Sequence, residues 1–119
     1  MKRKYIFSMI LILILLVGSI LIYNRVHAKS VINNYIVKQG IEKSQLNYTD
    51  FHKDFKMGGY FLNTYVDGEN PNIYYSYHYY DGRVYFEAYE LDETQIRKQF
   101  WGGNNLEENK FKKLKYPPH

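Results

Sequence analysis

Residues 73–90 read Ile-Tyr-Tyr-Ser-Tyr-His-Tyr-Tyr-Asp-Gly-Arg-Val-Tyr-Phe-Glu-Ala-Tyr-Glu, and they give the clearest indication of secondary structure outside the apolar N-terminal segment. Aromatic and branched side chains are enriched in β-strands, where they pack on a half-buried surface. Asp81-Gly82 interrupts the run, and this dipeptide is a strong signal for a two-residue hairpin turn. The stretch therefore predicts two antiparallel strands, 73–80 and 83–90.

A two-residue turn sets the register of this hairpin, and the register decides which side chains share a face. We expect the core face to carry Ile73–Glu90, Tyr75–Ala88, Tyr77–Phe86 and Tyr79–Val84. The other face would carry Tyr74–Tyr89, Ser76–Glu87, His78–Tyr85 and Tyr80–Arg83. A slip by one residue would exchange the two faces.

Two further strands are expected before the hairpin. The hydrophobic period becomes two at Leu46, so residues 46–56 and 60–66 predict strands. Met57-Gly58-Gly59 is the turn signal between them. The predicted fold class is thus α+β, with a small antiparallel sheet of three or four strands packed with one or two helices.

A helix is expected over residues 28–40, where apolar side chains follow helical spacing. Gly40 is placed to cap its end, and Ile41 to fold back on Ile36. Nothing between Tyr23 and Ala28 breaks a helix, so this element can continue from the apolar segment before it.

The segment Ile6–Ile22 is uncharged and apolar, and Lys2, Arg3 and Lys4 stand directly before it. Its 17 residues reach the lower limit of a spanning helix, for which about 20 are usual. We expect a retained single-pass anchor in the cell membrane, with the N-terminus inside and the C-terminal domain outside. The alternative is a signal peptide cleaved near Ala28, after which the protein would be secreted.

The charge distribution gives no reason to invoke nucleic acid. Residues 1–28 carry four basic residues and no acidic one, and the rest of the chain has 12 of each sign. The absence of cysteine excludes disulfides, thiolate metal sites and lipoprotein attachment. We therefore divide the chain into a basic start and anchor (1–28), an extracytoplasmic domain (29–101) and a basic tail (102–119).

The C-terminal part predicts a second helix after Leu91, capped by Asp92 and ending near Trp101. Residues 106–115 predict a short helical turn, and residues 116–119 a frayed end. The lysines of residues 110–115, with Phe111 and Leu114, could rest on anionic lipid or wall polymer. The ordinary alternative is a solvated tail.

The order of these features resembles a domain-of-unknown-function family of short, membrane-anchored proteins from Gram-positive bacteria. The resemblance rests on the basic start, the apolar segment, Tyr35-Ile36-Val37-Lys38-Gln39-Gly40 and Tyr79-Tyr80-Asp81-Gly82-Arg83-Val84. It covers about residues 1–90, and the extension after Asp92 departs from the family pattern. It implies an anchored extracytoplasmic domain and offers no catalytic residues.

A possible contact platform is expected on the face of the hairpin away from the core. We define this aromatic platform as Tyr74, His78, Tyr80, Tyr85 and Tyr89. Aromatic surfaces of this kind stack on sugars or peptides. In the alternative, the C-terminal helix covers this face with Ile96, Phe100 and Trp101.

Two other groups of side chains have the composition of chemical sites. His52 with Asp50 and Asp54 suggests a cation site, but a solvated strand face explains the same pattern. Ser76, His78 and Glu87 suggest a hydrolase, but cross-strand hydrogen bonding explains them as well. We expect no catalytic residue, metal or cofactor from either group.

The sequence thus favours a non-enzymatic, single-pass protein whose outer domain makes contacts at the cell surface. Its partner would be a protein, a peptide or a wall polymer. The alternative is an immunity-type membrane protein that protects against a secreted toxin peptide, with Ile6–Ile22 carrying the function.

Overall fold

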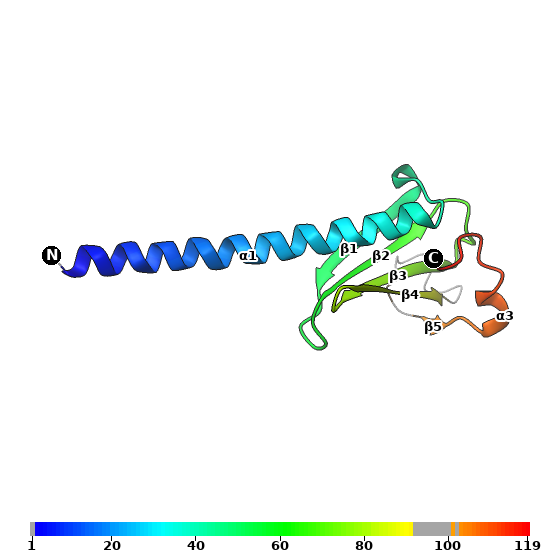
Figure 1. Ribbon diagram of the computed structural model, residues 1–119. Coiled ribbons are helices and arrows are strands. Elements are labelled where there is room, and N and C mark those ends of the chain that lie inside the picture. The colour runs from blue at the N-terminus through cyan, green and yellow to red at the C-terminus, as the bar shows by residue number, and fades with distance from the viewer. Residues whose placement is uncertain (1, 92–100, 102) are drawn as a thin grey trace.

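The computed structural model describes residues 2–91, 101 and 103–119, and its architecture is α+β, as predicted (Figure 1). Helix α1 (Lys2–Lys38) and the 3-10 helix η1 (Lys43–Gln45) precede the strands β1 (Leu46–Lys53), β2 (Tyr60–Val66), β3 (Ile73–Tyr80) and β4 (Arg83–Glu90). A two-residue strand β5 (Asn104–Asn105), which was not predicted, and a short helix α3 (Glu108–Phe111) follow. All five strands form one antiparallel sheet in the order β1-β2-β3-β4-β5.

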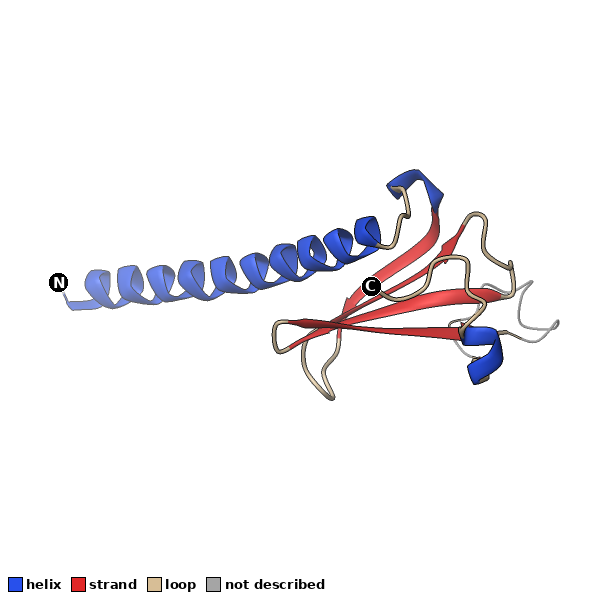
Figure 2. Cartoon of the chain, turned by 45° about the vertical axis from the view of Figure 1, so that its right-hand side comes forward, coloured by secondary structure: helices blue, strands red, loops and turns tan. Residues whose placement is uncertain are grey.

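Helix α1 runs without a break for 37 residues, so the apolar segment continues into the helix predicted over 28–40. At about 1.5 Å per residue it is roughly 55 Å long, and its N-terminal part projects well beyond the sheet (Figures 1 and 2). It is long and apolar enough to cross a membrane, a property that a signal sequence near the N-terminus shares.

The end of α1 is closed as the sequence predicts. The Gly40 amide donates to the carbonyl of Val37 at 2.9 Å, and the Ile41 amide donates to the carbonyl of Ile36 at 3.3 Å. These are the two bonds of a Schellman cap. Ile36 and Ile41 are both buried in the core, which supplies the apolar contact that accompanies such a cap.

The core lies between one face of the sheet and the C-terminal third of α1. Ala28, Ile32 and Ile36 are the buried residues of α1. They cover a face whose most deeply buried aromatic residues, Tyr75 and Tyr77, are both fully inaccessible. We call this the core face and the opposite side of the sheet the outer face.

The register of the β3–β4 hairpin is the predicted one, from Ile73–Glu90 through Tyr80–Arg83. Asp81 and Gly82 have φ angles of 50° and 77°. Positive φ at both central residues defines a type I′ turn, whose twist matches that of the flanking strands. The local turn chemistry therefore sets which tyrosines enter the core.

Strand β1 is shorter than predicted, because it ends at Lys53 and residues 54–59 form the turn to β2. The Asp54 amide donates to the Gly59 carbonyl at 3.0 Å, which closes this turn. A Cβ at Gly59 would lie 1.9 Å from the carbonyl oxygen of Tyr79. Only glycine allows the β1–β2 turn to approach β3 so closely.

The expectation of a frayed C-terminus is wrong. The side-chain amide of Gln39 donates to the carbonyls of Tyr116 and Pro117 at 3.2 and 3.3 Å. The His119 amide donates to the Tyr35 hydroxyl at 2.9 Å. Leu114 is buried in the core. The end of the chain therefore packs beside α1 on the core face.

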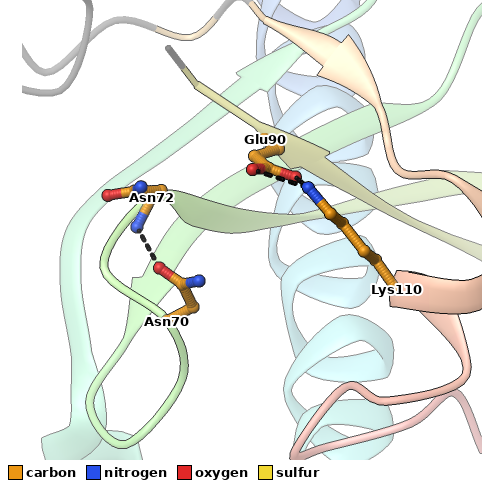
Figure 3. A network of polar contacts seen from close by, with 4 residues as sticks. All are labelled: Asn70, Asn72, Glu90 and Lys110. Carbon is orange, nitrogen blue, oxygen red and sulfur yellow. Dashed lines mark hydrogen bonds and ion pairs between the residues drawn. The ribbon is translucent and has the colours of Figure 1, made fainter. Parts of the chain in front are cut away.

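The lysine-rich segment is also more ordered than a solvated tail. Lys110 Nζ lies 2.8 Å from Glu90 Oε2 (Figure 3), and this hydrogen bond raises the pKa of Lys110. In the same view Asn70 accepts a hydrogen bond from the Asn72 amide at 3.0 Å. Phe111 packs against the core, so it is not free to enter a lipid surface beside the lysines. The predicted helical turn is confirmed as α3.

Candidate functional site

The outer face is built from three rows of side chains that run across the strands. Antiparallel register places directly opposed residues on the same face. The pairs His52–Phe61, Phe61–His78 and His78–Tyr85 make an aromatic row across β1 to β4. The Phe61 and His78 rings stack at 4.1 Å between centroids, and His78 lies 6.3 Å from Tyr85. We call this the proximal aromatic row.

A polar row lies beside it on the same four strands. The opposed pairs are Asp50–Asn63, Asn63–Ser76 and Ser76–Glu87. Ser76 is buried, and the Oδ1 atom of Asn63 is buried without a hydrogen-bond partner among the described residues. Buried polar atoms are almost always paired. The Asn63 Oδ1 atom is therefore an unused hydrogen-bond acceptor at the floor of this face.

The third row, the distal aromatic row, contains Tyr65, Tyr74 and Tyr89, and Trp101 lies against it. The Trp101 ring lies 5.2 Å from that of Tyr65 and 5.1 Å from that of Tyr74, between centroids. Tyr74 is only 4 % exposed, and its burial raises its pKa to about 12. Burial, followed by a hydrogen bond to Glu87, raises the pKa of Tyr89.

An open hollow of about 460 Å³ lies over the proximal row and the polar row. Its lining residues are Met57, Phe61, Ser76, His78, Tyr80, Tyr85, Glu87 and Tyr89. Four of the five residues of the aromatic platform are therefore brought together in one place. The fifth, Tyr74, does not line this hollow and is largely buried beside Trp101.

The alternative that the C-terminal segment covers this face is realised at the distal row, through Trp101. Ile96, Phe100 and the helix predicted from Asp92 lie outside the described residues. Phe61, Asn63 and Met57 of the outer face were missed by the sequence analysis, which paired only β3 with β4. The alternating pattern of residues 60–66 indicates that Phe61 and Asn63 share one face of a strand. The β2–β3 register is needed to show that this face lies beside His78 and Ser76.

His78 is held in place from three sides. Its Nε2 atom lies 3.0 Å from the Gly58 carbonyl oxygen, to which it donates as the protonated nitrogen. The Asp54 carboxylate lies 3.8 Å from the same nitrogen. Since the ring is also stacked on Phe61, His78 presents a fixed aromatic surface to the hollow.

Ser76, His78 and Glu87 do line the same hollow. Within the described part of the chain, however, no hydrogen bond joins Ser76 to His78, and His78 Nε2 is used by Gly58. A nucleophilic serine needs a base within hydrogen-bond reach. Among the described residues, Ser76 therefore has no hydrogen-bonded base.

The group of His52, Asp50 and Asp54, from which no metal site was expected, does not come together as a cation site. His52 Nδ1 lies 3.1 Å from Asp50 Oδ2, whereas the Asp54 carboxylate accepts from the Lys56 amide at 2.9 Å and lies 3.8 Å from His78 Nε2. Asp54 follows the end of β1 at Lys53, so it is not part of the strand that carries Asp50 and His52. Among the described residues, no group of three or more His, Asp or Glu side chains is placed to hold a metal ion.

The fold and the outer face together define a class of small α+β protein that has a long apolar N-terminal helix and an open aromatic hollow. The chain is 60 % identical, over 109 residues, to an uncharacterized 13.4 kDa protein of Bacillus thuringiensis. The match covers 92 % of this chain and 96 % of that protein. The chain belongs to the family of this uncharacterized protein. No family model and no solved structure matches it.

Proposed function

We propose that this protein is a membrane-anchored, non-enzymatic binding module that holds a carbohydrate chain of the cell envelope on the outer face of its sheet. The observation that carries the proposal is the order of rows on that face: a polar row flanked by two aromatic rows. In this proposal α1 is retained as an anchor, and the α+β domain lies outside the cell. The basic start of the chain supports that orientation.

Carbohydrate suits this surface because a sugar has apolar C–H faces and a rim of hydroxyl groups. Aromatic rings take up the first, and fixed polar groups take up the second. Tyr80 and Tyr85 are 43 % and 49 % exposed, so their rings are free to stack. Ser76, Glu87 and the ring of His78 supply hydrogen-bonding groups in the same hollow.

The dimensions of the face favour an extended chain of sugars over a small molecule. Residues four apart on a strand, such as Tyr85 and Tyr89, are about 13 Å apart at 3.3 Å per residue. The hollow, which Tyr85 and Tyr89 both line, therefore extends about 13 Å along β4. A peptide would more readily add to a sheet edge, where backbone groups are unpaired.

The proposal can be tested with the full chain in mild detergent and soluble oligosaccharides of N-acetylglucosamine as the probe. Tyr85→Ala should weaken binding by about three- to tenfold, the equivalent of one aromatic stacking contact. Tyr48→Ala is the matched control, because Tyr48 is 61 % exposed and does not line the hollow. Equal affinities of the two variants, or no binding of glycan by the unaltered protein, would reject the proposal.

A swap of Ile6–Ile22 for an unrelated spanning helix separates this proposal from an immunity role of the membrane segment. Glycan binding should survive the swap, because the hollow contains no residue of that segment. Protection against a toxin peptide that is lost on the swap, in a protein that binds no glycan, would favour the immunity role instead.

A further inference from the structure

We infer that the turns at one end of the sheet form a second membrane contact, resting among the anionic headgroups of the leaflet into which α1 leads. The contact consists of the β1–β2 turn (residues 54–59) and the β3–β4 turn (residues 80–83), and we call these the membrane-facing turns. The inference rests on the retention of α1 as an anchor, which belongs to the proposed function.

The position of the turns along α1 is the first argument. His27 of α1 contacts Tyr79, with 6.0 Å between ring centroids, and the guanidinium of Arg25 lies 4.7 Å from the ring centre of Phe51. Both strands then continue toward the N-terminal side of α1, where Figure 1 shows the two turns. The turns therefore approach the end of the apolar segment at Ile22.

Distances along the two elements bring the turns to the level of the headgroups. From His27 to Ile22 the helix rises about 7.5 Å at 1.5 Å per residue. From Tyr79 to the turn at Asp81, a strand covers up to about 7 Å at 3.3 Å per residue. A headgroup layer adds about 5–7 Å to each side of the hydrocarbon core. The turns thus lie within reach of that layer.

Exposed apolar side chains on these turns are the second argument. Phe55 is 89 % exposed and Met57 is 67 % exposed. Tyr80 of the neighbouring turn is half exposed as well. Large apolar side chains at loop tips are costly in water but favourable at a membrane interface, where aromatic rings concentrate.

Charge is the third argument. The turns themselves are neutral, with Lys56 and Arg83 against Asp54 and Asp81, and the positive excess comes from Arg25 and Lys29 of α1 and Lys53 at the end of β1. The Asp54 carboxylate accepts a hydrogen bond from the Lys56 amide and lies 3.8 Å from His78 Nε2. The surface that faces the membrane is therefore basic, as contact with an anionic leaflet requires.

The two turns are preorganised as one unit. The Gly58 carbonyl lies 3.0 Å from His78 Nε2, and the close approach of Gly59 to Tyr79 fixes the β1–β2 turn against β3. Phe55 therefore needs no rearrangement to reach the interface. Met57 and Tyr80 also line the hollow, so a docked domain would hold the hollow beside the membrane surface.

Single cysteines can test the contact directly, because the chain has none of its own. The full chain carrying Phe55→Cys, Ile14→Cys or Val37→Cys is labelled with a nitroxide and reconstituted in vesicles of phosphatidylcholine and phosphatidylglycerol. Collision rates with oxygen, which prefers lipid, and with a water-soluble nickel chelate report the depth of each label. Val37 is the matched control, since it is 67 % exposed near the opposite end of the domain.

We expect the oxygen-to-nickel ratio at position 55 to exceed that at position 37, and to fall toward it in the Lys53→Glu, Lys56→Glu background. A label at position 55 as accessible to nickel as that at position 37, with position 14 in hydrocarbon, would overturn the inference and leave the anchor intact. Aqueous exposure at position 14 would overturn both. Glycan binding by Phe55→Ser should stay unchanged, which keeps the outcome for the hollow separate.

Discussion

The buried hydroxyl of Tyr77 donates a hydrogen bond of 2.6 Å to the side-chain carbonyl of Gln39, at the end of α1. Tyr77 belongs to the middle of the sheet and Gln39 to the helix terminus, so this bond fixes where α1 crosses the core face. Gln39 also holds the carbonyls of Tyr116 and Pro117. One amide side chain thus connects the helix, the sheet and the C-terminus.

Gln39→Leu should therefore destabilise the domain by about 1–3 kcal/mol, because the Tyr77 hydroxyl would be left buried without an acceptor. Tyr77→Phe removes the donor and should cost less, about 1 kcal/mol. Urea unfolding of the full chain in mild detergent measures both. In a double-mutant cycle the two losses should not add, and strict additivity would mean that the bond contributes nothing.

The hairpin should depend on Gly82 and on the predicted register. Gly82→Val should cost on the order of 1–2 kcal/mol, because a branched residue resists the positive φ of the turn. Phe86→Ala should cost about 3 kcal/mol, since Phe86 packs against Tyr35, Tyr75 and Tyr77. Tyr85→Ala serves as the comparison and should cost clearly less. Equal losses at positions 85 and 86 in urea unfolding would contradict the assignment of faces.

The C-terminal segment should contribute to stability. Leu114→Ala should cost about 2–4 kcal/mol, because Leu114 is buried between the sheet and the end of the chain. Lys113→Ala, at an exposed neighbouring position, should change stability by less than about 0.5 kcal/mol. The urea midpoints of the two variants are compared, and a Leu114→Ala midpoint equal to that of the Lys113 control would show that the segment is not part of the core.

Alkaline pH should unfold the domain. Burial raises the pKa of Tyr74 to about 12 and also raises those of Tyr75 and Tyr77 above the ordinary value of 10. A raised pKa in the folded state means that stability is fully present below about pH 10 and is lost as the pH rises toward 12. Tyrosinate absorbance should rise together with the loss of circular dichroism. In Tyr74→Phe the loss of stability with pH should be less steep; an unchanged slope would contradict the role of Tyr74.

The membrane orientation predicted from the charges around the apolar segment can be tested in intact cells. A cysteine in place of Asn70, an exposed position in the loop before β3, should react with a membrane-impermeant thiol reagent. The excess of positive charge before Ile6 is the physical reason. Labelling that appears only after lysis would reverse the assignment of N-terminus inside and domain outside.

The sequence alone determined the features that depend on local chemistry. The Asp81-Gly82 turn imposed the hairpin register, because its positive φ angles and two-residue length leave one pairing. Gly40 and Ile41 predicted the end of the helix, and the uncharged segment Ile6–Ile22 predicted a helix long and apolar enough to span a membrane. Each of these signals lies within a few consecutive residues, so no distant partner was needed to read it.

Contacts between distant segments depend on the three-dimensional arrangement of the whole domain. The burial of Leu114, the bond from Gln39 to Tyr116 and the placement of Trp101 on Tyr74 join residues far apart in the chain. The local sequence of the lysine-rich segment and of the tyrosine-rich strands does not indicate these contacts, because the burial of a side chain depends on which distant segments pack against it. The hollow over His78 and Tyr85 exists for the same reason: Phe61 and Met57 reach it from β2 and from the turn before it.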